Sequence, residues 1–275
     1  MITSCANSKV KRIVGLQEKS RNRVKENVFI AEGIKMFEEA PIDNLMEIYI
    51  EETLYEMPEQ GELGKKLAEC QNKGISVETV SKEVFAKMSD TQSPQGVLCV
   101  MKRYTYDLKK VIEDACKKRE ENKRVPLFLL VEDIQDPGNL GTMMRTAEGA
   151  GADGIILTKG TADIYNPKTI RSTMGSLYRM PFVYVESLAE AITLLKQSQI
   201  KVYAAHLKGS KFFHEFSYKD GAAFMIGNEG NGLKKETADM ADCYLKIPME
   251  GQLESLNASI AAALLMYQAA LERLK

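Results

Sequence analysis

Three loops rich in glycine and asparagine carry most of the side chains that could do chemistry in the second half of this chain. Each loop follows a short apolar segment of strand type. Ligands of parallel α/β sheets bind beyond the carboxyl ends of the strands, so loops in this position are expected to converge on one site. The loops are Asp136-Pro-Gly-Asn-Leu-Gly141, Gly227-Asn-Glu-Gly-Asn-Gly232 and Pro248-Met-Glu-Gly-Gln-Leu-Glu-Ser-Leu-Asn257.

The glycine spacing argues against two common nucleotide sites. Gly227-x-x-Gly230-x-Gly232 does not have the G-x-G-x-x-G order of a dinucleotide fold, and no Lys-Ser or Lys-Thr pair follows it as in a P-loop. NAD binding and nucleotide hydrolysis are therefore poorly supported. For the first loop alone, a simple structural interpretation is favoured, in which Asn139 is the N-cap of the next helix.

The composition bounds the class of protein. A length of 275 residues suits two domains, and 44% hydrophobic with 27% charged residues is ordinary for a globular protein. Five dispersed cysteines without a C-x-x-C pair, with two histidines, predict neither a disulfide framework nor a metal site. No apolar run approaches the roughly 20 residues that a bilayer requires, and no signal peptide begins the chain. We expect a soluble, cytoplasmic protein without a metal or a membrane partner.

Basic residues are concentrated at one end of a nearly neutral chain. The whole sequence has 37 basic and 38 acidic residues, yet the first 27 residues hold seven basic side chains against two acidic ones. Such a cluster predicts contact with the phosphates of a polyanion, although each member taken singly is more simply an exposed helix residue. The cluster comprises Lys9, Lys11, Arg12, Lys19, Arg21, Arg23 and Lys25.

Two successive α/β arrangements must position these residues. Apolar segments of strand type alternate with amphipathic segments of helix type, which indicates a mostly parallel sheet covered by helices in the second half. In the first half, strands are predicted over residues 28–31, 45–50, 75–80 and 96–101, and helices over 32–40, 63–72 and 82–88. In the second half, strands are predicted over 127–131, 154–157, 182–185, 201–205, 223–226 and 243–247, and helices over 140–149, 167–177, 188–197 and 255–275.

A charged stretch of helical pattern, residues 107–124, separates the halves. We place an N-terminal domain at 1–103, a connector at 104–125 and a C-terminal domain at 126–275. The charge block at 117–124 is most simply a solvated connector, which could act as a hinge. A contribution to RNA binding is the alternative.

Taken together, the three loops resemble one family, the knotted α/β ribose methyltransferases of the SpoU or TrmH branch of the SPOUT superfamily, which use S-adenosylmethionine. Three motifs in the family's order make this resemblance specific over roughly residues 125–275. In the N-terminal half, a weaker resemblance points to a smaller RNA-substrate-binding domain, an α/β/α sandwich similar to a ribosomal protein. The matching stretches are 136–148, 226–232 and 247–259, with Phe29-Ile-Ala-Glu-Gly33 and Ser93-Pro-Gln-Gly-Val-Leu98 in the N-terminal half.

The resemblance implies a trefoil knot in the C-terminal domain and a site for S-adenosylmethionine within that knot. Glycines let the backbone approach a ligand closely, and an adenine suits an apolar slot with a few main-chain hydrogen-bonding groups. Without the resemblance, Ile247 and Leu256 would more simply be core residues. The positions implied to bind the methyl donor are Gly227, Gly232, Ile247, Met249 and Leu256.

The resemblance also implies residues for methyl transfer to a ribose 2′-hydroxyl, where positioning of the oxygen does much of the work. Each has a simpler structural interpretation. Arg145 could pair with Glu148, Glu229 could stabilise its own loop, Ser255 could be the N-cap of the last helix, and Asn257 could support that turn. The implied catalytic residues are Asn139, Arg145, Glu229, Ser255 and Asn257.

Arg145 is the family's usual candidate for activating the hydroxyl. A guanidinium with a pKa above about 12 is a poor general base. We therefore favour the hypothesis that Arg145 orients the neighbouring RNA phosphate and stabilises the developing alkoxide, while the proton leaves to phosphate or water.

The third loop departs from the family's pattern. It carries Glu250 and Glu254 where small or neutral residues are common, and Ala258 where valine is frequent. None of these changes removes an implied catalytic side chain, but acid beside a polyanion site opposes RNA docking. Lys168 and Arg171 are candidates to offset that acid, with an exposed helix face as the equally weighted alternative.

The last helix is expected to bear an apolar stripe. Residues Ile260, Leu264, Tyr267, Leu271 and Leu274 recur at spacings of four and three. Packing against the helix's own sheet is the default interpretation. The resemblance implies a homodimer in which the arginine of one subunit completes the partner's site, so we expect part of the stripe to be intersubunit.

The sequence thus predicts a ribose 2′-O-methyltransferase that acts on RNA and uses S-adenosylmethionine. Ribosomal RNA is the favoured substrate, because the N-terminal half resembles those of ribosomal RNA enzymes, and transfer RNA is the alternative. A non-catalytic RNA-binding protein that keeps the fold is the alternative from another class.

Overall fold

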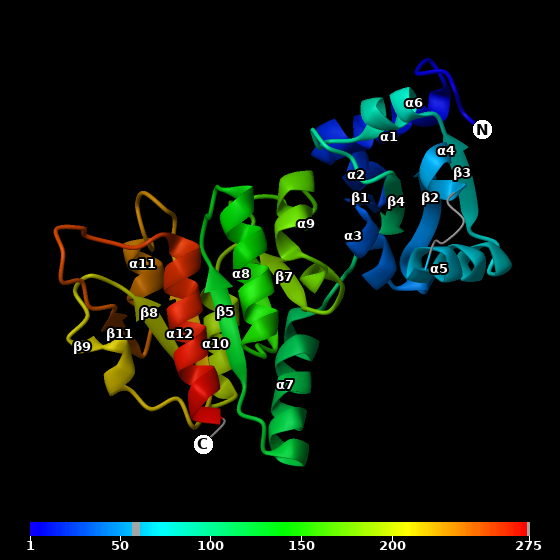
Figure 1. Ribbon diagram of the computed structural model, residues 1–275. Coiled ribbons are helices and arrows are strands. Elements are labelled where there is room, and N and C mark those ends of the chain that lie inside the picture. Colours follow the sequence, from blue (N-terminus) through cyan, green and yellow to red (C-terminus); the bar gives the residue numbers. More distant parts are fainter. Residues whose placement is uncertain (57–60, 274–275) are drawn as a thin grey trace. The chain divides into compact units, whose positions relative to one another are not determined.

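The computed structural model describes residues 1–56 and 61–273, which fall into two compact units (Figure 1). Unit 1 comprises Met1–Tyr104 and Asp163–Tyr178, and unit 2 comprises Thr105–Ala162 and Arg179–Lys275. The chain therefore leaves unit 2 after residue 162 and re-enters it at residue 179. The domain limits expected from the sequence stay a prediction.

Unit 1 is built on a four-stranded sheet of order β1-β4-β2-β3. Strand β4 (Val97–Lys102) is antiparallel to β1 (Val28–Glu32) and β2 (Leu45–Glu51), whereas β3 (Ser76–Val80) is parallel to β2. Figure 1 shows α1 and α6 on one face of this sheet and α3 and α5 on the other. The helices are α1 (Ser8–Glu18), α2 (Ser20–Glu26), α3 (Ile34–Glu39), the short η1 (Ile42–Asn44), α4 (Glu52–Tyr55), α5 (Gly61–Asn72) and α6 (Lys82–Met88).

A buried ion pair holds the later segment 163–178 within unit 1. The Nη2 atom of Arg23 donates to Oδ2 of Asp163 at 2.7 Å, and the hydroxyl of Ser20 donates to the same oxygen at 2.8 Å. Nη1 of Arg23 donates to the carbonyls of Leu16 and Gln17 near the end of α1. Arg23 is thus almost fully buried with its charge matched, and it is not available to the polyanion surface expected from the sequence.

Aromatic packing reinforces this attachment. The ring of Tyr165 lies 4.9 Å from that of Phe29, and the guanidinium of Arg103 lies 4.6 Å from the same tyrosine ring. Helix α9 (Pro167–Thr173) follows and contacts β1, and the 3₁₀ turn η2 (Ser176–Tyr178) ends the segment. There the hydroxyl of Tyr178 donates to the carbonyl of Met36 at 2.9 Å.

Unit 2 contains a seven-stranded sheet of order β7-β6-β5-β10-β8-β11-β9 in which every neighbouring pair is parallel. This confirms the mostly parallel α/β fold expected for the second half. The strands are β5 (Leu127–Val131), β6 (Gly154–Thr158), β7 (Phe182–Val185), β8 (Lys201–Ala205), β9 (Lys211–Phe212), β10 (Ala222–Ile226) and β11 (Cys243–Lys246). The helices are α7 (Leu108–Asn122), α8 (Pro137–Gly149), α10 (Ala189–Gln197), the short η3 (Phe213–Glu215), α11 (Lys235–Ala238) and α12 (Ala258–Arg273).

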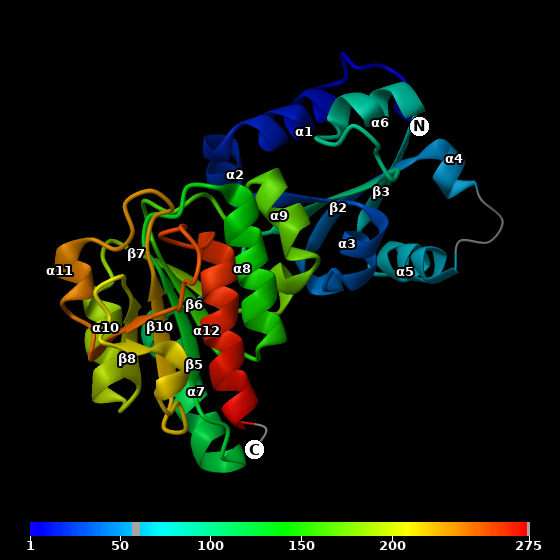
Figure 2. The same ribbon diagram turned by 60° about the vertical axis from the view of Figure 1, so that its left-hand side comes forward.

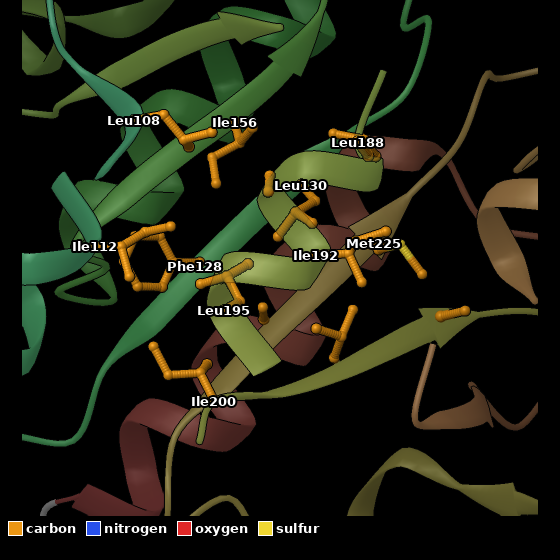
Figure 3. Packing of buried hydrophobic residues seen from close by; sticks show 14 of the residues in the cluster. Leu108, Ile112, Phe128, Leu130, Ile156, Leu188, Ile192, Leu195, Ile200 and Met225 are labelled. Atoms are coloured by element: carbon orange, nitrogen blue, oxygen red, sulfur yellow. The ribbon is translucent and has the colours of Figure 1, made fainter. Parts of the chain in front are cut away.

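Helices cover both faces of this sheet, which explains why its central strands are continuous apolar runs. Figure 3 shows Leu108 and Ile112 of α7 and Ile192 of α10 packed with Phe128 and Leu130 of β5 on one face. The alternate residues of β5 and β10 face the other way, and α8 and α12 lie side by side on that second face (Figure 2). The trefoil knot implied by the resemblance stays a prediction.

Helix boundaries differ from the expectation where local capping decides them. Helix α8 begins at Pro137 rather than residue 140, because Asp136 caps it and proline is tolerated in a first turn. The helix expected over 167–177 ends at Thr173, because Met174 adopts a left-handed conformation and Gly175 also has positive φ. The structure also contains α1, α2, β9 and α11, which the sequence pattern does not predict; β9 and α11 are only two and four residues long and carry little periodicity.

We predict that Arg23→Met destabilises the protein by about 2–4 kcal/mol, because it leaves a partly buried carboxylate and two carbonyls without their donor. Thermal and urea unfolding would measure the change. Arg21→Met, which removes an exposed arginine two residues earlier, is the matched control and should be nearly neutral. Equal stability of the two variants would contradict the prediction.

The same pair predicts a pH dependence. Burial raises the pKa of Asp163, but the hydrogen bonds and charge of Arg23, with Tyr165 N–H and Ser20, hold that pKa below its ordinary value. A lowered carboxyl pKa contributes stability that is present above the unfolded value, about 3.9, and is lost as the pH falls through the folded value. The stability difference between wild type and Asp163→Asn should therefore shrink in acid.

Candidate functional site

A pocket of about 340 Å³ opens in unit 2 at the carboxyl ends of β8, β10 and β11. That volume is within the range of small-molecule sites, and its position is the one expected for a ligand of a parallel sheet. Apolar side chains of Leu207, Ile226, Leu233 and Ala261 line it together with main chain from the glycine-rich loop. All five positions implied to bind the methyl donor also line it: Gly227, Gly232, Ile247, Met249 and Leu256.

The glycine-rich loop after β10 is a tight backbone turn that leaves no room for a side chain at its start. A Cβ on Gly227 would lie 2.1 Å from the carbonyl carbon of Gly232. Asn228 and Gly232 exchange two main-chain hydrogen bonds of 3.0 and 2.9 Å, and Gly232 has a φ of 67°. The Asn228 side chain accepts hydrogen bonds from the amides of Gly230 and Asn231. The three glycines of the loop thereby place main chain at the pocket, beside Asn228, Glu229 and Asn231.

Glu229 joins this loop to the one that follows β5. Its carboxylate accepts hydrogen bonds from the backbone amides of Gln135 and Asp136, each at 3.0 Å, and from Nδ2 of Asn139 at 3.1 Å. Burial raises the pKa of Glu229, but these donors outweigh it and hold the pKa below its ordinary value. A carboxylate held ionised by three N–H groups is suited to fixing a loop rather than to accepting a proton.

Asn139 and Asn257 extend the connection to the third loop. Nδ2 of Asn257 donates to Oδ1 of Asn139 at 2.9 Å, and the other amide atom of Asn139 reaches Glu229. The loops that were expected to converge are therefore linked by one hydrogen-bonded chain, Asn257 to Asn139 to Glu229. Ser255 lines the pocket in the same loop as Asn257. No observation on the structure tests the catalytic roles, which stay predictions.

Two capping interpretations were wrong. The N-cap of α8 is Asp136, whose Oδ1 accepts the backbone amide of Asn139 at 2.8 Å, so the Asn139 side chain is free to reach across loops. The last helix begins at Ala258, and the oxygen of Asn257, not of Ser255, accepts the amide of Ser259. Asp, Asn and Ser side chains within three residues of a helix start all compete to cap it, and the sequence pattern does not rank them.

Arg145 lies apart from the pocket of its own chain. It is exposed on α8 and makes no hydrogen bond or ion pair with any residue in 1–56 or 61–273. The proposed pair with Glu148 was wrong, because that carboxylate bonds to Arg179 instead. Arg145 precedes Gly149 by one helical turn, and a Cβ on Gly149 would lie 2.9 Å from the Tyr267 hydroxyl of α12.

The apolar stripe of α12 faces outward. Ile260, Leu264, Tyr267 and Leu271 are 51, 38, 45 and 54% exposed, and Leu274 lies outside the described residues. The face that packs on the sheet and α8 consists instead of Ala258, Ala262, Leu265, Met266 and Ala269. The default interpretation, that the stripe packs on its own sheet, was therefore wrong.

The basic residues of unit 1 fall into two groups, those that form an ion pair and those that do not. Several cations have acidic partners: Arg12 bonds to Glu26 and Glu47, Lys9 to Glu78, and Arg171 to Asp90. Four others of the N-terminal cluster are exposed and form no ion pair with a described residue, namely Lys11, Lys19, Arg21 and Lys25. The surface available to a polyanion is thus smaller than the sequence predicts.

The described part of the chain offers neither a metal-binding cluster nor a membrane-spanning helix. Residues 1–56 and 61–273 contain no group of three or more histidine, cysteine, aspartate or glutamate side chains placed to hold a metal ion. None of the helices within these ranges is long and apolar enough to cross a membrane.

Known proteins resemble this chain over nearly its whole length. Residues 126–267 match the SpoU rRNA methylase family, and residues 7–99 match the MRM3-like substrate binding domain. The 23S rRNA (guanosine(2553)-2′-O)-methyltransferase RlmP of Bacillus subtilis is 34% identical over 97% of both chains. A putative TrmH family tRNA/rRNA methyltransferase of the same organism, YacO, is 31% identical over 76% of this chain and 82% of its own. The crystal structure of an AdoMet-bound rRNA methyltransferase from Sinorhizobium meliloti superposes with a TM-score of 0.81 at 28% identity, covering 98% of this chain and 96% of that one.

We predict that Glu229→Gln loosens the loop after β5. A glutamine offers one acceptor and places an NH₂ group against an N–H donor, so at least one of the amides of Gln135 and Asp136 loses its partner. Hydrogen exchange at these two amides should become faster, while Glu250→Gln in the third loop serves as the control. Unchanged exchange in Glu229→Gln would show that its carboxylate does not fix the loop.

Proposed function

The chain belongs to the SpoU rRNA methylase family, and we propose how its residues divide the work of methylating a ribosomal RNA ribose. It is an RNA 2′-O-ribose methyltransferase that uses S-adenosylmethionine as the methyl donor. The observation that carries the division of roles is the hydrogen-bonded chain from Asn257 through Asn139 to Glu229 beside the pocket.

The pocket suits the methyl donor. Gly227 lets the glycine-rich loop fold back tightly at the pocket, since a Cβ there would collide with the backbone of Gly232, and the apolar walls of the pocket suit an adenine. Ile247, Met249 and Leu256 would hold the donor beside Gly227 and Gly232. When bound, S-adenosylmethionine supplies an electrophilic methyl group that the ribose 2′-oxygen attacks in line. The trefoil knot around this site is part of the proposal.

The acceptor side depends on positioning. Asn139 is fixed at both ends of its amide, by Asn257 and by Glu229, so its orientation is set before any RNA binds. Ser255 lies at the pocket wall with no hydrogen-bond partner among the described residues, and its hydroxyl is available to the incoming ribose. Glu229 acts through Asn139 and is therefore a positioning residue.

Arg145 serves the site of a second subunit. Its exposed guanidinium has no counter-ion in the described chain, and it is on the side of α8 that adjoins Tyr267 of the exposed α12 stripe. An apolar stripe of this kind suits a homodimer interface. Across such an interface, Arg145 orients the phosphate next to the target ribose and stabilises the developing alkoxide, and the proton leaves to phosphate or water.

Large-subunit ribosomal RNA is the proposed substrate. The relative RlmP, which aligns over nearly its whole length, is named as a methyltransferase of a 23S rRNA guanosine ribose. The equivalent guanosine is therefore the first candidate. Four unpaired cations of the N-terminal cluster are available for its phosphates. An enzyme of ribosomal RNA works in the cytoplasm of a bacterium, and we propose that location.

Transfer of labelled methyl from S-adenosylmethionine to unmethylated 23S rRNA tests the substrate. The expected product is a single 2′-O-methylated nucleoside, found by digestion and separation and mapped by blocked alkaline cleavage. Label found on transfer RNA alone would show that transfer RNA, and not ribosomal RNA, is the substrate. Donor binding without transfer to any RNA, including ribosomal particles, would favour a non-catalytic RNA-binding protein.

A mixed dimer tests the placement of Arg145. We predict that Arg145→Ala and Asn257→Ala each lose about 100-fold or more in turnover, with donor binding kept in Arg145→Ala. A dimer purified with one copy of each variant has one intact site, so it should recover about half of the wild-type turnover. Dimers of two differently tagged Arg145→Ala copies are the control. No recovery in the mixed dimer would place Arg145 in its own subunit's site.

A further inference from the structure

An aromatic and basic edge of unit 2 has no role in the site described so far. Strand β9 forms the last strand of the sheet and pairs with β11, with Lys211 opposite Leu245 and Phe212 opposite Lys246. Figure 1 shows β9 and β11 at the outer edge of unit 2. We call this surface the β9 edge, and it consists of Lys208, Lys211, Phe212, Phe213, His214, Phe216 and Lys246.

Rings and ammonium groups alternate along the β9 edge. The ring of His214 lies nearly parallel to that of Phe212, at 7° and 5.7 Å between centroids, and Phe213 meets His214 edge-on at 5.6 Å. The ammonium of Lys246 lies 4.8 Å from the Phe212 centroid, and that of Lys211 lies 5.9 Å from the Phe216 centroid. His214 is exposed, so one ring of this series faces solvent.

The β9 edge carries three lysines against the one carboxylate of Glu215. Lys208, Lys211 and Lys246 form no ion pair with any residue of the described ranges. The nearby Glu215 accepts the backbone amide of Phe212. Aromatic faces thus hold two of the lysines in place and leave their full charge for a ligand.

The edge is rigidly attached to the fold. Phe216 packs against Tyr203 of β8 at 5.5 Å between ring centroids, and the hydroxyl of Tyr218 donates to the carbonyl of Phe213. A Cβ on Gly209 would lie 2.7 Å from the backbone of Leu245, so the chain before β9 is pressed against β11. A surface fixed in this way needs little ordering when it binds a ligand.

The edge adjoins the pocket. Lys246 belongs to both, since it covers Phe212 and lines the pocket, and His206 and Leu207 line the pocket just before Lys208. A ligand on the β9 edge therefore lies next to whatever is bound at the carboxyl ends of the strands.

We propose that the β9 edge binds a single-stranded stretch of the RNA next to the target nucleotide, with a base stacked on His214 and phosphates on Lys208 and Lys211. Unpaired bases stack on aromatic rings and phosphates seek unneutralised cations, and the β9 edge combines both. A protein partner would call for a larger apolar area than these half-buried rings expose. The proposal rests on the methyl transfer to RNA proposed above, because the pocket beside the edge then holds the reacting ribose.

Variants of His214 and of Lys211 test the proposed RNA contact, with unmethylated 23S rRNA as the probe. His214→Ala should raise the KM for RNA about fivefold or more, since stacking of one base is worth about 1–3 kcal/mol, while kcat and donor affinity stay within about twofold. His214→Phe should restore the wild-type KM. A folding defect would instead lower the thermal stability and reduce donor binding.

Salt dependence supplies a second measurement. Lys211→Met should reduce the slope of log Kd for RNA against log salt by about 0.7, the value for one phosphate contact on a single strand. Lys201→Met, at the opposite end of β8 from the pocket, is the matched control and should keep the wild-type slope. Wild-type KM in His214→Ala, or equal slopes in both lysine variants, would overturn the proposal. If the wild-type protein transferred no methyl group to any RNA, the proposed function would be overturned instead. The salt dependence of the Kd for RNA would still test the β9 edge.

Discussion

The carboxylate of Glu229 is the interaction on which the arrangement of the site depends. Beyond the sheet, side chains join the loops after β5 and β10: Asn228 Nδ2 donates to the carbonyl of Asp133 at 2.9 Å, and Glu229 binds the backbone amides that follow. One ionised carboxylate satisfies two of those amides and one side-chain amide at once. Charge-assisted hydrogen bonds of this kind are about twice as strong as neutral ones. Asn139 in turn accepts a hydrogen bond from Asn257, so the carboxylate of Glu229 is connected to all three loops.

Much of this site could be read from the sequence, because its loops are marked by glycine and asparagine at strand ends. Gly227 is an example, since a residue whose Cβ would lie 2.1 Å from another backbone atom can only be glycine. Capping was harder to read. Asp136 and Asn139 are both good N-cap residues, and only the three-dimensional path shows that the aspartate caps α8 and frees the asparagine.

Long-range partners account for the other differences. Arg145 and Glu148 have ideal helical spacing, but Arg179 lies closer to the glutamate in space. The α12 stripe has the periodicity of a buried face, yet small residues between its members let the helix pack closely with its other side. Hydrophobic periodicity identifies a face that avoids water. It does not say whether the same chain or another one covers that face.

The path of the chain between the two units has a consequence for how such an enzyme can change in evolution. Residues 163–178 are encoded inside the stretch that matches the methylase family, yet they belong to the first unit. Exchange of the N-terminal half for that of another protein would therefore strip Asp163 of Arg23 and Tyr165 of Phe29. The two halves are not interchangeable modules joined by one linker. A new RNA-recognition half can be acquired only together with a compatible insert, so gene fusion at the connector is disfavoured and the two halves are expected to diverge as a pair.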